Sequence, residues 1–256
     1  MKIVVCVKQV PDTWAEKKLN PADSTLDRAS VDAVINELDE YAIEEALQIA
    51  EANGGEVVVL SMGPDRTTES IRKALSMGAA RGVHVVDDAL HGACASGTSK
   101  ALAKAIEAEA PDLVIFGSES TDARMSVVPA MVAERLGYPQ LTFANNVTVD
   151  GGTVTIKRQT EAGVDVVAGA TPAVVSVVEK INEPRYPNFK GIMAAKKKPI
   201  DSKSLADLGL DGAGVSATSS VVEFADAPPR AAGVVVKDEG NGGVQIAEYL
   251  STQKFI

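Results

Sequence analysis

The sequence predicts an α/β fold with a doubly wound, mostly parallel sheet, antiparallel edge strands and an extended C-terminal arm. Two observations lead to this class. Short runs rich in Val and Ile alternate with helical patterns up to residue 137, and glycine turns and strands replace the helices after residue 140. Parallel strands buried on both faces need helical crossovers, which are right-handed and cover the two faces of the sheet.

The first half of the chain contains four expected strands and four expected helices. The apolar runs at 3–7, 57–60, 83–86 and 113–116 have strand length. The expected helices are 32–53, 67–79, 97–110 and 126–137. In the first helix, apolar residues from Ile35 to Ile49 recur at helical spacing, with glutamates outside this stripe. Met77-Gly78 is a typical helix C-terminus.

A different pattern follows residue 140. Asp150-Gly151-Gly152 separates two strand-like runs and indicates a hairpin. Runs at 164–167 and 173–178 continue as strands, and we expect these strands to be antiparallel additions at the sheet edge. Beyond residue 200 the chain is rich in Ala, Asp, Gly, Ser and Pro, which predicts an arm ending in a short helix near 245–250. The expected organisation is a nucleotide-binding-like domain (1–182), a partner loop (183–200) and the C-terminal arm (201–256).

Composition excludes several classes of protein. The 256 residues carry a formal net charge of −10, which argues against nucleic-acid binding, because phosphate backbones need a clustered basic surface. Two cysteines exclude a disulfide scaffold and a four-thiolate metal site. The N-terminus MKIVVCVKQV resembles a first strand and lacks a cleavage site, and no apolar run approaches bilayer length. We therefore expect a cytoplasmic protein that is not embedded in a membrane.

Ligands of doubly wound sheets bind outside the carboxyl ends of the strands, where the strand order reverses. Residues 8–14, 62–64 and 117–122 follow the first, second and fourth expected strands, and helix-start amides behind them could bind phosphate. A glycine-rich dinucleotide fingerprint and a Walker lysine loop are both missing from the sequence. From the spacing alone, ordinary strand-to-helix turns remain the alternative.

The sequence offers no catalytic pattern. Its two histidines are His84, expected in the core or on a sheet face, and His91, expected at the surface. There is no His pair at metal spacing, no nucleophile elbow and no Cys-His arrangement. We expect no acid–base chemistry by this chain and no metal site.

The stretch EPRYPNFKGIMAAKKKP at 183–199 combines loop-forming prolines, apolar side chains and three consecutive lysines. One interpretation is a solvated helix end punctuated by prolines. The other is a docking loop, because an apolar anchor within a charged rim suits protein binding. The residues alone leave both open.

Four stretches together resemble the β subunit of electron-transfer flavoprotein: VKQVPDT, NELDEYAIEEAL, GPDRTTESIRKALSMGAARGVHV and NEPRYPNFKGIMAAKKKPI, with GxExxD at 117–122. The resemblance is collinear from residue 1 to about 211. It implies an adenine-nucleotide α-hydrolase-like, Rossmann-like fold in an electron carrier without catalytic residues of its own. It also implies a heterodimer with an α subunit that holds most of one FAD, with the β subunit covering part of the flavin. The family carries electrons from acyl-CoA dehydrogenases, as in fatty acid β-oxidation, to a membrane quinone oxidoreductase.

The resemblance also assigns site residues. Many members hold a structural AMP at the switch point, for which the adenine-side residues would be Cys6, Asn36, Glu37, Leu38, Asp39 and Met62. The phosphate-side residues would be Asp122, Ala123, Arg124, Met125, Ser126, Val127 and Val128. The partner-docking residues would be Glu183, Pro184, Arg185, Tyr186, Phe189, Ile192, Met193, Lys196, Lys197 and Lys198, with Phe189 as the anchor.

This chain departs from the family pattern in two places. Relatives carry a polar, glycine-containing run where this chain has Ser126-Val127-Val128-Pro129, although Arg124 could supply donors there. Gln159 follows Arg158 where relatives often place a carboxylate beside the flavin. Two alternatives remain: an electron-bifurcating form with a second FAD in the β subunit, and a stand-alone adenine-nucleotide-binding module like a stress protein. The short polar turn after Asp122 favours the non-bifurcating form, and residues 183–199 argue against the stand-alone module.

Overall fold

A nine-stranded sheet lies at the centre of the larger of two units. The computed structural model describes residues 1–230, 232–233 and 235–256, and contacts divide the chain into Met1–Ser220 and Val221–Ile256. The strand order is β11-β5-β4-β1-β6-β10-β7-β8-β9. The strands are β1 Lys2–Cys6, β4 Glu56–Met62, β5 Arg81–Val85, β6 Leu113–Gly117, β7 Gln140–Asp150, β8 Thr153–Thr160, β9 Gly163–Ala170, β10 Ala173–Val177 and β11 Ile200–Lys203.

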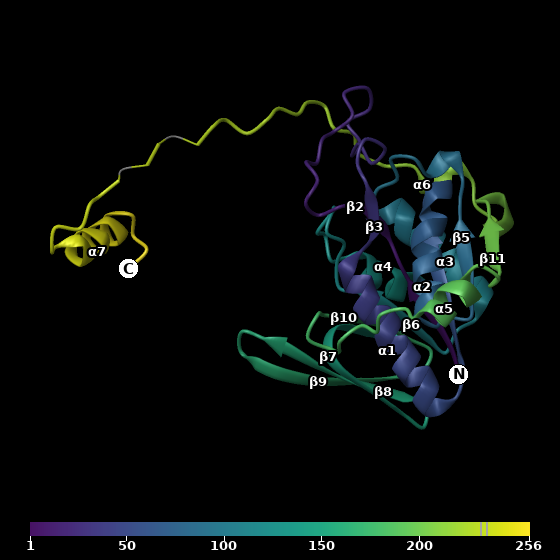
Figure 1. Ribbon diagram of the computed structural model, residues 1–256. Coiled ribbons are helices and arrows are strands. Elements are labelled where there is room, and N and C mark those ends of the chain that lie inside the picture. Colours follow the sequence, from purple (N-terminus) through teal and green to yellow (C-terminus); the bar gives the residue numbers. More distant parts are fainter. Residues whose placement is uncertain (231, 234) are drawn as a thin grey trace. The chain divides into compact units, whose positions relative to one another are not determined.

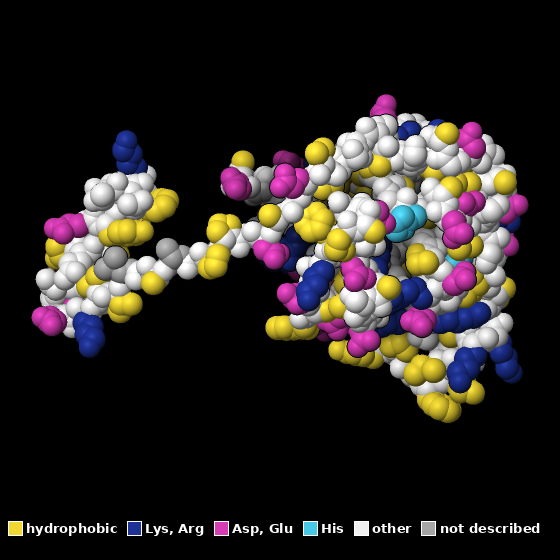
Figure 2. Space-filling model, turned by 90° about the horizontal axis from the view of Figure 1, so that it is seen from above, with side chains coloured by type: hydrophobic (Ala, Val, Ile, Leu, Met, Phe, Trp, Pro, Cys, Tyr) yellow, Lys and Arg dark blue, Asp and Glu magenta, His cyan; other side chains and the backbone are white. Residues whose placement is uncertain are grey.

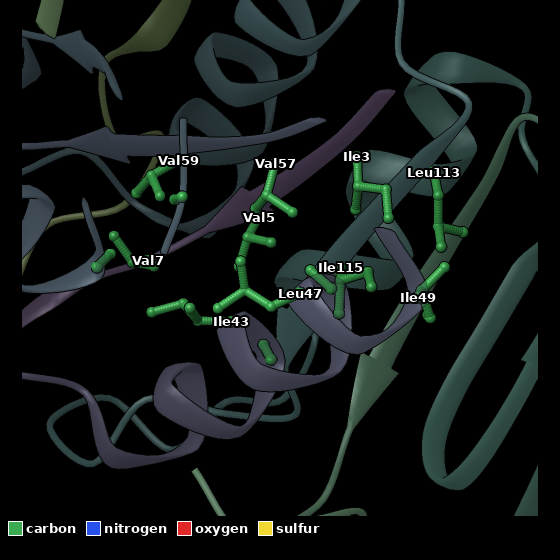
Figure 3. Packing of buried hydrophobic residues seen from close by; sticks show 14 of the residues in the cluster. Ile3, Val5, Val7, Ile43, Leu47, Ile49, Val57, Val59, Leu113 and Ile115 are labelled. Carbon is green, nitrogen blue, oxygen red and sulfur yellow. The ribbon is translucent and has the colours of Figure 1, made fainter. Parts of the chain in front are cut away.

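Helices cover both faces of this sheet (Figure 1). α1 (Glu37–Asn53) and α2 (Thr68–Met77) pack on one face, and α3 (Ala95–Glu109) and α4 (Val128–Leu136) pack on the other. Alternate residues of the central strands therefore face different helices, and every side chain in these strands can be apolar. Figure 3 shows the first face, where Val5 and Ile115 lie around Leu47 of α1. The α/β class and the doubly wound sheet are confirmed.

The C-terminal part of the sheet differs from the expectation in one strand. β7, β8 and β9 form the expected antiparallel edge, and Gly151 and Gly152 turn the β7–β8 hairpin with positive φ values of 53° and 84°. β10, however, lies between β6 and β7 and is parallel to both, so its expected place at the antiparallel edge was wrong. All five of its residues are buried, which a central strand allows and an edge strand does not.

The first helix begins later than expected. Residues 33–35 form β3 (Ala33–Ile35), which pairs antiparallel with β2 (Gln9–Pro11), and α1 starts at Glu37. The β-branched residues Val34 and Ile35 favour a strand over a helix, and Ile35 is buried in the core. The apolar stripe that suggested a helix from residue 32 therefore belongs to two elements.

The expected C-terminal arm also begins later. β11 pairs with β5, and Leu205, Leu208 and Val215 are buried in the segment that follows. These contacts hold residues 201–220 to the larger unit, and the second unit starts at Val221. Its helix α7 (Gly242–Thr252) contains the expected helical segment, which is confirmed. The remaining short helices are η1 Asp65–Thr67, η2 Asp88–Leu90, α5 Phe189–Ala195, η3 Ala206–Leu208 and α6 Gly212–Val215.

The distribution of charged side chains and the character of the helices agree with the composition. Acidic and basic side chains are interspersed on the face shown in Figure 2. Among the described residues, none of the helices combines the length and apolarity that crossing a membrane requires.

Candidate functional site

The strand order reverses beside β1. From β1 the chain moves outward through β4 and β5, and then returns to place β6 on the other side of β1. The loops that leave β1 and β6 therefore diverge at the carboxyl ends of the strands, as at a topological switch point. Five residues meet here, and we call them the switch-point cluster: Lys8, Arg28, Asn36, Asp39 and Asp122.

Asn36 and Asp39 tie the start of α1 to the loop after β6. The Asn36 amide nitrogen donates to Asp39 Oδ1 (3.0 Å) and to the Glu119 carbonyl (2.9 Å), and its oxygen accepts from the Thr121 amide (3.1 Å). The Lys8 amide donates to Asp39 Oδ2 (2.7 Å). Asn36 and Asp39 are both buried, so these bonds form in a poorly hydrated environment. Their main effect is to fix the positions of the loops after β1 and β6 relative to each other.

Asp122 collects two cations. Its Oδ1 lies 2.9 Å from Lys8 Nζ, and its Oδ2 lies 2.5 Å from Arg28 Nη2. Although burial opposes ionisation, Lys8 and Arg28 hold the pKa of Asp122 well below its usual range. While the buried Asp39 carboxyl is protonated, two cations against the Asp122 carboxylate leave one positive charge in excess. Lys8 and Arg28 are partly exposed, so this charge is accessible to an anion.

Two donors at the switch point lack partners. Arg28 Nη1 and Thr121 Oγ1 are buried atoms, and among the described residues neither finds a hydrogen-bond partner. Buried polar atoms without partners are uncommon in folded proteins and call for a ligand or water. With the excess positive charge, they fit the phosphate of a nucleotide. Arg28 was not expected from the sequence, since it lies in the loop between β2 and β3 without a motif around it.

The loop from 122 to 128 has an unusual backbone. Arg124 and Ser126 have positive φ values of 50° and 55°, which non-glycine residues seldom adopt. The Ser126 hydroxyl donates to Glu119 Oε2 at 3.0 Å, and α4 starts only at Val128. Four of the expected phosphate-side residues have exposed side chains: Ala123, Arg124, Met125 and Val127. Asp122 is the one whose carboxylate is held at the switch point.

The adenine-side residues also separate into groups. Cys6 is buried in the core cluster on the α3–α4 side, where desolvation raises the pKa of its thiol, and partly buried Met62 packs against the same cluster. Leu38 is partly exposed and Glu37 is exposed. Gly117 begins the loop at 117–122 that the sequence placed at the cleft, and the structure shows why a glycine stands there. A Cβ there would lie 2.5 Å from Asp39 Oδ1 and 2.8 Å from the Leu38 carbonyl carbon.

The Asp39 carboxyl makes the stability of the fold depend on pH. Burial raises its pKa to about 7, against an ordinary value of 3.8, although hydrogen bonds from Asn36 and Lys8 oppose the rise. Since the native state binds the proton more tightly, Asp39 destabilises the fold progressively as pH rises from about 4 to 7. We expect the wild type to lose up to about 1.4 kcal/mol per pH unit from this group, and Asp39→Asn to lack that loss. Urea unfolding of both proteins at pH 5, 6, 7 and 8 measures the difference, and parallel pH profiles would contradict it.

The expected partner loop (183–200) contains one short helix with an exposed apolar surface. The Asn188 side chain caps α5 by accepting from a backbone amide of its first turn at 2.8 Å. Phe189, Ile192 and Met193 of this helix are exposed, Phe189 to 78%. We call these three residues the docking ridge. Tyr186 precedes α5 in the chain and is 95% exposed, so it adds a further aromatic side chain to the exposed surface of the segment.

Two of the residues expected in the docking set are held within the chain. Arg185 donates from Nε to Glu44 Oε2 (2.7 Å) and from Nη1 to Glu51 Oε1 (2.6 Å). Lys198 Nζ donates to the carbonyls of Leu75 (2.9 Å) and Ala79 (2.5 Å) at the end of α2, and desolvation lowers its pKa. The lysine run therefore divides, because only Lys196 and Lys197 are exposed. Glu183 is also exposed, and Pro184 is partly buried.

A groove of about 500 Å³ lies where β7 and β8 meet the turn after β10. Its lining includes Phe143, Arg158, Gln159 and Lys180. Arg158 Nε donates to the Thr142 carbonyl at 2.6 Å, which fixes the guanidinium beside Gln159. Phe143 and Val178 offer apolar surface beside this fixed cation, and such a surface could cover one face of a flat cofactor.

The histidines occupy the places expected for them. His84 is buried in β5, with Nε2 2.9 Å from the Gly63 carbonyl, and His91 is exposed and lies 2.8 Å from Asp23. In the part of the chain that the structure describes, no group of three His, Cys, Asp or Glu residues could hold a metal ion.

Comparison with known proteins gives consistent matches. The family model "Electron transfer flavoprotein domain" matches residues 23–208. A relative from Mycobacterium leprae, named electron transfer flavoprotein subunit beta, is 52% identical over 99% of both chains. Relatives with the same name from Syntrophomonas wolfei and Megasphaera elsdenii are 38% and 35% identical, over 98% and 100% of this chain and 96% and 100% of their own length.

Proposed function

Because the chain belongs to the electron transfer flavoprotein family as a β subunit, an electron-carrier subunit and not a catalytic enzyme, we propose a specific carrier cycle for it. A β subunit implies an α subunit as its partner. In the proposed cycle the heterodimer holds one FAD, mostly on the α subunit. It accepts electrons from acyl-CoA dehydrogenases, as in fatty acid β-oxidation, and delivers them to a membrane quinone oxidoreductase. The observation that carries this proposal is the exposed docking ridge, because apolar side chains gathered at a protein surface mark an interaction site.

The bound FAD would supply the electron-transfer chemistry. The residues of this chain would position and cover it. Phe143 and Arg158 line the groove beside β7 and β8, and this groove suits a flavin face presented by the α subunit. Gln159 offers a hydrogen bond there and no charge, so this chain would hold the flavin domain less tightly than a carboxylate would.

We further propose that the switch point holds AMP. Lys8, Arg28 and the Thr121 hydroxyl would hold the phosphate, because they supply the excess positive charge and the two unpartnered donors. Asn36 and Asp39 would keep the surrounding loops in place. This assignment moves the phosphate contacts away from the exposed side chains at 123–125 and onto residues from three different loops.

The test is the nucleotide content of the heterodimer. The chain is co-expressed with the α subunit from the same source, the complex is denatured, and the released nucleotides are identified by chromatography with mass detection. One FAD and one AMP per heterodimer would support both proposals. Two FAD would identify an electron-bifurcating form, and one FAD without AMP would contradict the switch-point assignment. A complex that forms without FAD would contradict the carrier cycle.

A further inference from the structure

The docking ridge stands on a helix that is fastened to α2 from both sides. Arg72 of α2 donates from Nη1 to the carbonyls of Ala195 and Lys198, both at 2.6 Å. In the opposite direction, Lys198 donates from Nζ to the carbonyls of Leu75 and Ala79 in and after α2. Arg72 thus pairs with carbonyls at the C-terminal end of α5, and Lys198 pairs with carbonyls at the C-terminal end of α2. A positive charge is favourable at the C-terminal end of a helix.

Close packing accompanies this exchange. A Cβ at Gly191 would lie 2.5 Å from the Ser76 carbonyl oxygen, so only glycine allows α5 to approach α2 at this distance. Ala195 is buried on the same side of α5. The apolar side chains of the ridge are exposed, and the helix that carries them therefore divides into a packed side and a free side.

The chain before α5 is fastened as well. Arg185 bridges Glu44 and Glu51 of α1, and the Asn182 amide nitrogen donates to the Tyr41 carbonyl (3.1 Å) and to Glu45 (3.0 Å). The segment that carries the ridge is consequently anchored at both ends to helices of the main sheet.

We propose that Arg72 and Lys198 are positioning residues, which hold the docking ridge in its binding conformation before a dehydrogenase arrives. This inference rests on the proposed carrier function. Binding by a preorganised surface avoids the entropy cost of ordering that surface in the complex. Charge-assisted hydrogen bonds to partly buried carbonyls are strong enough to maintain such an arrangement. Arg72 would therefore affect partner affinity through α5, without being the anchor.

We call the hydrogen bonds of Arg72 and Lys198 between α2 and α5 the clamp. Amide hydrogen exchange of the purified heterodimer tests the clamp in the absence of a dehydrogenase. We expect Arg72→Met to accelerate exchange in peptides that cover α5 by about tenfold or more, in proportion to the loss of a charge-assisted hydrogen bond. Gly191→Ala should have the same effect by displacing α5 from Ser76, and it leaves both cations in place. Lys104→Met is the control, because Lys104 lies on α3, which packs on the other face of the sheet, and pairs with Glu107. Unchanged exchange in α5 of both test variants would overturn the clamp.

A double-mutant cycle with an acyl-CoA dehydrogenase from the same source tests the consequence for docking. We expect Arg72→Met to raise the KM for the carrier about tenfold with kcat unchanged. In a Phe189→Ala background the same substitution should add less than about threefold, because the ridge that it positions has lost its anchor. Full additivity, or an equal effect from Lys104→Met, would overturn the positioning role. If Phe189→Ala alone leaves KM unchanged, the proposed docking function fails, while the exchange rates still report on the clamp.

Discussion

Replacement of Phe189 by Ala is expected to raise the KM of an acyl-CoA dehydrogenase for this carrier by about thirtyfold, and to leave kcat unchanged. Phe189 is 78% exposed at the start of α5, and Ile192 and Met193 extend the same apolar surface. An aromatic side chain at the centre of a small interface commonly contributes about 2 kcal/mol or more to binding, which corresponds to this factor. The measurement is steady-state reduction of the heterodimer at varied carrier concentration.

The specificity of that effect can be controlled with Val166→Ala. Val166 is another exposed apolar side chain, but it lies on β9 at the end of the sheet farthest from β5 and β11. FAD content should equal that of the wild type in both variants, because neither residue lines the groove beside Gln159. A KM increase of the same size in Val166→Ala would show that loss of exposed apolar area, and not the ridge, weakens the encounter.

The central strands were predictable because their composition carries the signal. β1, β4, β5 and β6 are buried on both faces, so runs of Val, Ile and Leu identify them without any periodicity. β10 has the same signal, but its direction and neighbours depend on how the chain returns after the β8–β9 hairpin. Local sequence does not encode that return, and β10 consequently looked like one more edge strand. The near-continuous apolar run Ala-Val-Val-Ser-Val was the available indication of a central position.

The site was predictable only where the residues follow a strand. Lys8 and Asp122 fall in the loops expected at a switch point, but their ion pair joins positions 114 residues apart. Arg28 also pairs with Asp122, from a loop without a recognisable sequence pattern. Lys198 shows that a sequence pattern can also suggest the wrong role. In sequence it belongs to a basic run, and in the structure it caps the end of α2 through carbonyls that lie 123 and 119 residues earlier in the chain.

Substitution of Gly117 by Ala should have the second large effect, on stability and on nucleotide retention together. The added methyl group would lie 2.5 Å from Asp39 Oδ1 and 2.9 Å from Leu38 Cβ, so the start of α1 must move away from β6. Overpacking of this kind costs about 1–3 kcal/mol of unfolding free energy. The displacement would also disturb Asn36, whose two hydrogen bonds with Glu119 and Thr121 hold the loop that leads to Asp122.

Urea unfolding and the AMP content of the heterodimer measure the two consequences of Gly117→Ala separately. Gly243→Ala is the matched control, since a Cβ there meets nothing within 4 Å. If the loops after β1 and β6 form the nucleotide site, the loss of AMP should accompany the loss of stability, and FAD on the α subunit should stay bound. A destabilised variant that retains its full AMP content would place the nucleotide elsewhere, because the phosphate-binding residues proposed here cannot keep their geometry once α1 has moved.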